Sequence, residues 1–469
     1  MFPLAGALPD GPASADRTAC PPASAGEPQP SRRSQTVAVA AVLGAMALVV
    51  LDAAMTSLAL PAIAADLGVA PALAVAVVTA YQTGLIVALL PCAALGERFG
   101  CRRVFVSGLV LFLAAATLCA LSPSLPWLIA ARLLQGLGGA AVMALGVPLM
   151  RLAVPPARLG AVIGWNALAV ALAGSAGPSL AALVLSHGTW PLLYLSGLPL
   201  GTFVLATSPG LPRTPGSGQP LDLRGMALSA GMFAALIVGA GLLTERPLAA
   251  GVLLLLGAAG MAVLVRREAP KAAPLIPLDL LRGRSFRLSV TASVLCFAGQ
   301  TAAMIMLPFH LQGELGQSAA MAGACLAAWP LSVAAAAAAT GRLGEAVSTA
   351  WLCAAGGACL ALGLAAVALW PQGEPGPLIG CIAVCGAGFG LFQTPNNRNM
   401  FLSAPLARSA ASGGLQGTAR LTGQTAGAVL SALLFSLGSS GSAPRVGLGI
   451  GAGLALAAGF TSLLRRKRQ

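Results

Sequence analysis

Residues 35–67 read QTVAVAAVLGAMALVVLDAAMTSLALPAIAADL, and this stretch decides the fold. The interior of the apolar run holds a single carboxylate, that of Asp52. A hydrocarbon core about 30 Å thick is crossed by roughly 20 apolar residues of helix, so the run predicts a transmembrane helix. An ionised side chain near the middle of such a helix costs about 2.5–3.5 kcal/mol on insertion scales, which makes Asp52 a predicted functional residue.

The composition of the whole chain agrees with that interpretation. Its 469 residues are 57% hydrophobic and 9% charged, whereas a soluble domain carries about 25% charge. The ten cysteines are scattered without a CxxC pair, and there are two histidines, which disfavours a zinc site or a disulfide framework. The sequence predicts an all-α polytopic membrane protein with no metal site.

About fourteen apolar segments follow one another between residues 37 and 464. The seventh and eighth, near 225–243 and 248–265, have short polar flanks that leave room for one re-entrant pair. Residues 1–34 are rich in Pro, Ala, Ser and Gly and lack the pattern of a signal peptide, so we expect a disordered cytoplasmic tail.

The basic residues predict the orientation. With a cytoplasmic N-terminus, 23 of the 27 Lys and Arg residues fall on the cytoplasmic side, as the positive-inside rule requires. Arg246 and Arg445 fall outside, and Arg132 and Arg420 lie within segments. We therefore expect a multi-pass protein of the plasma (inner) membrane with both termini cytoplasmic. The net charge of +14 follows membrane loops and does not indicate nucleic-acid binding.

The loop after the second segment reads AALGERFGCRRV, residues 93–104. Glu97, Arg98 and Arg102 flank Gly100, whose freedom at positive φ permits a tight turn. The alternative is an ordinary solvated basic loop. The stretch resembles the signature Gly-x-x-x-Asp-Arg-x-Gly-Arg-Lys of the major facilitator superfamily, with Ala93 and Cys101 as departures and Glu97 in place of Asp. Residues 341–345, GRLGE, resemble an eroded second copy. The resemblance implies a conformational switch at this loop.

The fourth segment reads ARLLQGLGGAA, residues 131–141. Arg132 within an apolar helix needs a partner or water, unless it reaches back to the outer interface. The stretch resembles the superfamily motif Arg-x-x-Gln-Gly, matched at Arg132, Gln135 and Gly136, which implies a part in proton transfer. Asp52 and Arg132 both fall in the outer halves of their predicted helices, so an interaction between them is geometrically plausible.

The fifth segment contains AGSAGPSLAA, residues 173–182. It resembles the antiporter motif of the superfamily, with Gly177 and Pro178 matched and alanines in place of three glycines. The resemblance implies a hinge or seal and export.

Three further stretches narrow the resemblance to 14-helix drug:proton antiporters. They are 51–61 around Asp52, 307–312 with Trp329-Pro330, and 418–427, in which Arg420 is expected to take part in the conformational switch. Tyr81-Gln82 and the stretch 395–397 are similar to methyl viologen (quaternary ammonium) exporters.

Polar or aromatic side chains within predicted spans are candidates for the substrate pocket, since a cation can sit over an aromatic face. Aromatic residues also anchor helices at membrane interfaces, so the two readings stay open for each of them. The candidates are Tyr81, Gln82, Trp165, Asn166, Gln300 and Gln393.

The resemblance implies a major facilitator fold with two six-helix bundles and two extra helices. We expect the N-terminal bundle at 35–208, a linker with the inserted pair at 209–286, the C-terminal bundle at 287–464 and a basic cytoplasmic tail at 465–469. The expected unit is a monomer in the lipid bilayer.

The predicted function is proton-coupled efflux of lipophilic drugs, with a cation expected as substrate. Asp52 would take up a proton from outside in competition with the drug. The coupling ion is the proton, and no cofactor is expected. The alternative is a dedicated exporter or importer of one metabolite. No catalytic residue is predicted, because the chain has no HExxH motif, nucleophile–base set or phosphate-binding loop.

Overall fold

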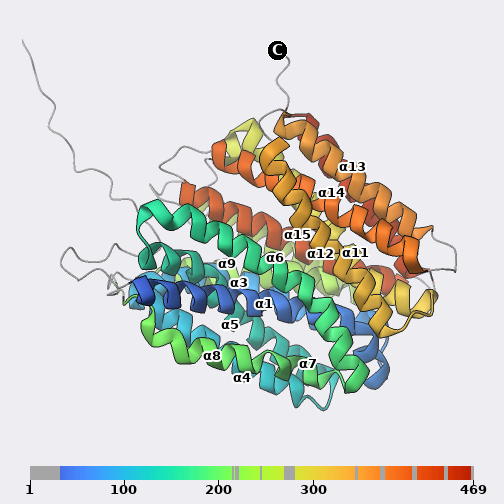
Figure 1. Cartoon of the computed structure of the whole chain (residues 1–469), viewed down its shortest axis with the longest axis horizontal. Coiled ribbons are helices and arrows are strands. Elements are labelled where there is room, and N and C mark those ends of the chain that lie inside the picture. The colour runs from blue at the N-terminus through green and yellow to red at the C-terminus, as the bar shows by residue number, and fades with distance from the viewer. Residues whose placement is uncertain are drawn as a thin grey trace, which may run out of the picture.

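The computed structural model describes most of the chain from residue 32 onward. The described residues are 32–213, 216, 221–242, 246–268, 280–343, 347–369, 375–403, 409–437 and 442–465. Residues 1–31 of the predicted tail at 1–34, residues 466–469 of the predicted tail at 465–469, and residues 344–345 at the end of the second loop motif lie outside them. Every regular element within the described residues is a helix (Figure 1).

Eight helices make up the first half of the molecule. Their bounds are α1 Arg32–Asp66, α2 Pro71–Ala74, α3 Ala76–Phe99, α4 Cys101–Ala120, α5 Leu125–Ala153, α6 Pro156–His187, α7 Pro191–Ser196 and α8 Leu198–Thr207. Two helices follow, α9 Leu223–Gly241 and α10 Pro247–Glu268. The second half contains α11 Arg284–Phe309, α12 Ala319–Leu343, α13 Thr349–Ala368, α14 Pro375–Leu402, α15 Ser409–Leu437 and α16 Ala443–Leu463.

The fourteen predicted segments each coincide with one helix or with two consecutive helices. Twelve spans in the described residues are long and apolar enough to cross a membrane. The α6 and α15 helices, of 32 and 29 residues, occupy the positions of the fifth and thirteenth segments. The α9 and α10 helices both qualify as spans, so the seventh and eighth segments are two long helices and not one short re-entrant pair.

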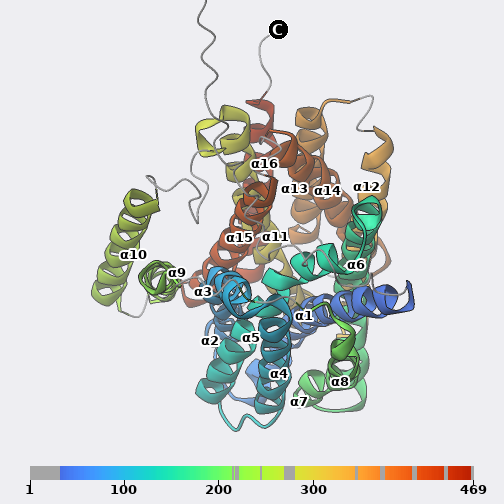
Figure 2. The ribbon, with the colours of Figure 1, turned by 90° about the vertical axis from the view of Figure 1, so that its left-hand side faces the viewer.

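The two halves lie on either side of a central region, with the first half below and the second half above in Figure 2. The main contacts between them are those of α6 with α12, of α1 with α11, and of α15 with α2 and α3. The predicted domain boundaries stay a prediction.

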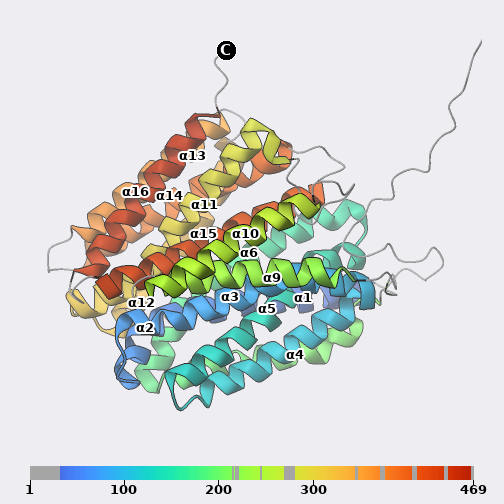
Figure 3. The same cartoon turned by 180° about the vertical axis from the view of Figure 1, so that it is seen from behind.

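Helices α9 and α10 lie to one side of the two halves, with α10 outermost (Figure 2). They pack mainly on each other, and α9 also contacts α3 of the first half and α15 of the second. Figure 3 shows the pair from behind, running across the face on which α3 and α15 lie.

The halves are packed together at one end. A single apolar cluster joins Leu58 of α1 and Ala182 of α6 to Leu326 of α12 and Phe435 of α15. At Gly323 of α12, an added Cβ would lie 2.5 Å from the Cβ of Ala182 and 2.9 Å from the carbonyl oxygen of Pro178. Only glycine permits this approach of α6 and α12. The contact holds the two halves together at the end of the molecule where α1 ends.

Candidate functional site

Asp52 and Arg132, for which the sequence made an interaction plausible without establishing it, are in direct contact. Oδ2 of Asp52 in α1 lies 2.5 Å from Nη1 of Arg132 in α5. Gln135, one turn further along α5, donates from Nε2 to Oδ1 of Asp52 at 2.9 Å and accepts from Nη1 of Arg132 through Oε1 at 2.6 Å. The side chains are buried, with Asp52 9%, Arg132 1% and Gln135 0% exposed. The three form a closed ring in which each carboxylate oxygen has one strong partner.

Close helix packing brings a third helix to this ring. Gly84 of α3 and Gly136 of α5 face each other, and a side chain on either would meet the backbone of the other helix. Small residues at such a contact let transmembrane helices approach closely. The approach places Tyr81 of α3 under Arg132, whose guanidinium carbon lies 4.2 Å from the centre of the tyrosine ring.

Both tyrosines of the chain lie against Arg132. The ring centre of Tyr194 in α7 is 5.6 Å from the guanidinium carbon. A cation over an aromatic face is stabilised electrostatically, by about 2 kcal/mol or more where water is excluded. The Tyr81 hydroxyl donates to the carbonyl of Val49 at 3.3 Å, so it is occupied and ties α3 to α1. Arg132 is thus held by charge, by hydrogen bonds and by two rings.

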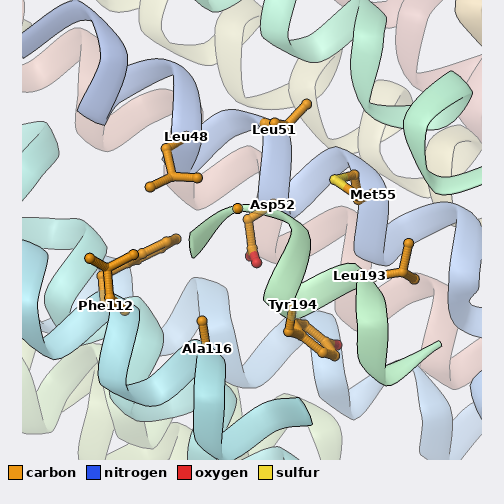
Figure 4. Close-up of a pocket in the computed structure, with 10 residues that line it drawn as sticks. Leu48, Leu51, Asp52, Met55, Phe112, Ala116, Leu193 and Tyr194 are labelled. Carbon is orange, nitrogen blue, oxygen red and sulfur yellow. The ribbon is translucent and has the colours of Figure 1, made fainter. Parts of the chain in front are cut away.

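A small void adjoins the carboxylate of Asp52, as Figure 4 shows. Its volume of about 10 Å³ is close to the space that one water molecule needs. Apart from Asp52 and Tyr194, its labelled lining is apolar, with Leu48, Leu51 and Phe112 among it. Beyond its contacts with Arg132 and Gln135, the acid therefore borders a small, mostly apolar void rather than open solvent.

A larger cavity of about 330 Å³ lies between the two halves. Helices α1, α3, α5 and α6 line it from the first half, and α11, α12, α14 and α15 from the second. Its volume falls in the range of about 300–1,000 Å³ that is typical of small-molecule sites. Aromatic residues in its wall are Tyr81, Phe297, Trp329 and Phe389.

Four of the six predicted pocket residues line this cavity: Tyr81, Gln82, Gln300 and Gln393. Trp165 and Asn166 of α6 are not part of its lining. The Trp165 side chain is 61% exposed, which is the position of an outward-facing or interfacial aromatic residue. Asn166 is part-buried.

Arg132 lines the large cavity as well as contacting Asp52, whereas Asp52 lines only the small void. The acid lies behind the arginine as seen from the cavity. A change in the charge of Asp52 therefore reaches the cavity through Arg132.

The predicted switch residues fall in two places. Glu97, Arg98, Gly100 and Arg102 lie at the junction of α3 and α4, where Gly100 has φ 94° and separates the two helices. The guanidinium carbon of Arg98 lies 5.2 Å from the ring centre of its neighbour Phe99. None of these residues lines the cavity.

Gly177, Pro178 and Arg420 lie near the centre of the molecule. At Gly177 of α6 an added Cβ would be 2.5 Å from the Cβ of Ala54, so the glycine sets the distance between α6 and α1. Pro178 and Arg420 both line the large cavity.

A second polar cluster closes the far end of α11. His310 is fully buried at the start of a π-helical turn, His310–Glu314, and its Nδ1 lies 3.1 Å from Oε2 of Glu314. Nε of Arg445 in α16 lies 2.6 Å from the same oxygen. Nε2 of His310 is 3.2 Å from the carbonyl oxygen of Val367 in α13. The cluster ties α11 to α13 and α16.

Several residues of the site were not assigned from the sequence. Gln135 was matched to a motif but not predicted to bind Asp52, although a glutamine three residues after an intramembrane arginine shares its helix face. Tyr194 was missed despite being one of two tyrosines. Gln424 of α15 lines the cavity one turn after Arg420. No group of three or more His, Cys, Asp and Glu residues that could hold a metal is found in the described part of the chain.

Comparison with known proteins identifies the family. The family model described as Major Facilitator Superfamily matches residues 42–428. The solved structure of a POT family transporter in complex with 5-aminolevulinic acid superposes with a TM-score of 0.72, at 15% identity, over 93% of this chain and 97% of that one. The chain therefore belongs to the major facilitator superfamily and is a multi-pass membrane transporter by family and fold.

Its sequence relatives carry different descriptions. An uncharacterized transporter, YebQ of Escherichia coli strain K12, is 39% identical over 94% of this chain and 97% of its own length. The riboflavin transporter RibZ of Clostridioides difficile strain 630 is 27% identical over 79% of this chain and 81% of its own length. The multidrug resistance protein Stp of Mycobacterium tuberculosis is 27% identical over 86% of this chain and 76% of its own length.

Proposed function

We propose that this chain exports lipophilic small molecules in exchange for protons by alternating access. The observation that carries the proposal is the buried ring of Asp52, Arg132 and Gln135 beside a cavity between the two halves. Ionisable groups buried within membrane-spanning helices are costly, and their usual role is in substrate, ion or proton pathways. The descriptions of relatives such as Stp favour drug export.

The chemistry of the ring suits a proton-controlled contact. While Asp52 is ionised, it attracts Arg132 in a site where water does not screen the charges. A proton on Asp52 removes this attraction and turns one acceptor oxygen into a donor, so the ring must rearrange. Because Arg132 also lines the cavity, the rearrangement alters the surface that a substrate contacts.

The arrangement of helices supplies the moving parts. The α1 helix, which carries Asp52, also packs on α6 and α11, and α6 packs on α12 of the other half. A shift of α1 relative to α5 is therefore transmitted to the contact between the halves. One proton moving inward across 100 mV contributes about 2.3 kcal/mol from the membrane potential alone.

The lining of the cavity supports a lipophilic substrate. Most of its residues are apolar, among them Leu58, Met143 and Phe297, although four glutamines and two arginines also line it. The plasma (inner) membrane, cytoplasmic termini, a monomeric state, and a proton as coupling ion without any cofactor are parts of the same proposal.

The test is proton-driven transport by the purified full-length chain in liposomes. An acidic lumen should drive concentration of a dye into the vesicles, and an uncoupler should abolish it. The probes are rhodamine 123, a cation, and fluorescein methyl ester, an anion built on the same ring system, with protein-free liposomes as the baseline. Asp52→Asn should lose the concentrative step.

Asp66→Asn is the matched control, since it makes the same change on the same helix. Asp66 accepts from Nε1 of Trp190 at 2.7 Å, and an asparagine oxygen can keep that bond. It should transport as the unchanged chain does. Concentrative uptake by Asp52→Asn equal to that of the unchanged chain would overturn the proposed role of the acid.

A dedicated transporter of one molecule is the second candidate, favoured by the description of RibZ as a riboflavin transporter. Competition separates the two. Unrelated lipophilic compounds should each inhibit dye transport by a multidrug exporter, whereas a dedicated transporter should respond to one chemical family.

A further inference from the structure

Arg420 of α15 is a charge in the cavity that the proposed proton mechanism does not use. It is part-buried and lines the cavity. Its Nε is enclosed and has no hydrogen-bond partner, and no carboxylate of the described residues forms an ion pair with it. Arg132, the other arginine of the lining, is by contrast fully engaged with Asp52 and Gln135.

The described lining of the cavity therefore carries an excess of positive charge. Its charged residues are Arg132 and Arg420, and no Asp or Glu is among them. Asp52 faces Arg132 from behind and neutralises that arginine only. The charge of Arg420 is left for the content of the cavity to balance.

An unbalanced guanidinium among apolar helices is costly, and such charges are normally met by a partner, by backbone carbonyls or by a water-filled space. Gln424 lies one turn further along α15 and also faces the cavity, so two donor-bearing side chains share this wall. Guanidinium groups suit planar anions such as carboxylates, because their N–H donors form a fork that matches two oxygens.

Other residues of the cavity wall indicate what the rest of a ligand would contact. The rings of Phe297 and Phe389 meet edge to face, with centres 5.3 Å apart, and both line the cavity with Trp329. Oε1 of Gln82 is a buried acceptor without a partner, which a hydroxyl or amine of a ligand would satisfy. The walls suit an aromatic body with one donor group.

The geometry points to a subsite for an organic anion: an aromatic, amphipathic molecule whose carboxylate, sulfonate or phenolate group binds Arg420. This inference rests on the proposed transport function and names the substrate class for it. It departs from the cation expected from the sequence, because that expectation came from a resemblance and from aromatic residues, whereas the described cavity offers a cation no carboxylate.

The inference also places the charged group of the substrate and the coupling proton at two different sites. Arg420 belongs to the second half, and the ring of Asp52 belongs to the first. A substrate anion at Arg420 and a proton on Asp52 then occupy different sites, so their coupling runs through the movement of the halves rather than through competition for one carboxylate.

The test is equilibrium binding, without transport, to the full-length chain in lipid nanodiscs. Fluorescence anisotropy measures the Kd of fluorescein methyl ester and of rhodamine 123 at pH 8, where the first is an anion and the second a cation. The anion should bind at least about tenfold more tightly. Arg420→Gln should raise the Kd of the anion by about tenfold or more, since one charge-assisted bond is lost, and should leave the Kd of the cation unchanged or lower.

Two further variants make the outcome specific. Arg420→Lys keeps the charge and should retain part of the preference for the anion. Arg103→Gln removes an exposed arginine at the start of α4, away from the cavity, and should bind both dyes as the unchanged chain does.

Equal affinity for the two dyes, absence of binding by the anion, or an equal loss of both in Arg420→Gln would overturn the inference. Because binding is measured without a gradient, failure here is distinct from failure of proton coupling. Asp52→Asn should keep the preference for the anion even where it abolishes concentrative transport.

Discussion

Asp52 and Arg132 are 80 positions apart in the chain, and their side chains meet at 2.5 Å in the interior of the first half. The contact joins α1 to α5, and Gln135 closes it from the third side. Each of the three residues fills the hydrogen-bonding needs of the others. The loss of one member is therefore expected to cost more than the loss of two.

The first prediction concerns this dependence. Arg132→Leu leaves a buried carboxylate without its cation and should destabilise the protein by about 3–5 kcal/mol, as removal of one partner of a buried pair typically does. The double variant Asp52→Leu with Arg132→Leu leaves no stranded charge and should recover much of that loss. Thermal unfolding in detergent micelles measures both. Additive losses in the double variant would show that the contact is not a coupled pair.

The second prediction concerns the spacing of α1 and α6. Gly177→Ala places a methyl group 2.5 Å from the Cβ of Ala54, which no relaxed structure permits, and should destabilise by about 1–3 kcal/mol. Gly231→Ala, in α9, meets nothing within 4 Å and should be neutral or stabilising by up to about 1 kcal/mol through better helix propensity. Unfolding midpoints of the two variants give the comparison. The same midpoint for both would mean that α6 does not depend on the glycine.

The third prediction concerns closure. Gly323→Val cannot keep α12 against Ala182 and Pro178 and should shift the molecule toward forms in which α6 and α12 are apart. Spin labels placed at Ser186 and Ser318, which are both exposed, should be farther apart in Gly323→Val than in the unchanged chain when measured by double electron–electron resonance. Gly449→Val has open space around it and is the control. An unchanged distance in Gly323→Val would contradict the packing described for this end.

The fourth prediction compares two members of the cluster at the end of α11. His310 is fully buried and bonded to Val367, so His310→Ala should cost about 1–3 kcal/mol. The Arg445 side chain is 49% exposed, and its pair with Glu314 is screened, so Arg445→Gln should cost less than about 1 kcal/mol. Chemical denaturation in micelles ranks the two. A larger loss for Arg445→Gln would mean that the ion pair, not the histidine, holds the cluster.

The sequence predicts the helices well because a membrane leaves few options. A run of roughly 20 apolar residues must form a helix to satisfy its backbone groups, so Asp52, Arg132 and Arg420 could be placed within helices in advance. The family resemblance then implied the major facilitator fold, which the comparisons with known proteins confirm.

The contacts were harder to predict because most of these helices are apolar on all sides. The direction in which a side chain faces does not follow from such a helix. For Trp165 the pocket and the membrane interface therefore both stayed open, and its side chain is 61% exposed. Likewise, the choice of Asp52 as the partner of Arg132 depends on helices far apart in sequence. The isolation of Arg420 is a property of its surroundings and has no signature in the residues next to it.

The position of α9 has a mechanical consequence. Because α9 packs on α3 of one half and on α15 of the other, it bridges the interface between the two halves. A motion that separates α3 from α15 must break the contact of α9 with one of these two helices. Because α9 packs mainly on α10, the α9–α10 pair can then move together with the helix that α9 still contacts. The contacts of α9 with α3 and α15 therefore limit how far the two halves can separate on this side. Among the described helices, no helix outside the two halves bridges α6 and α12 in the same way.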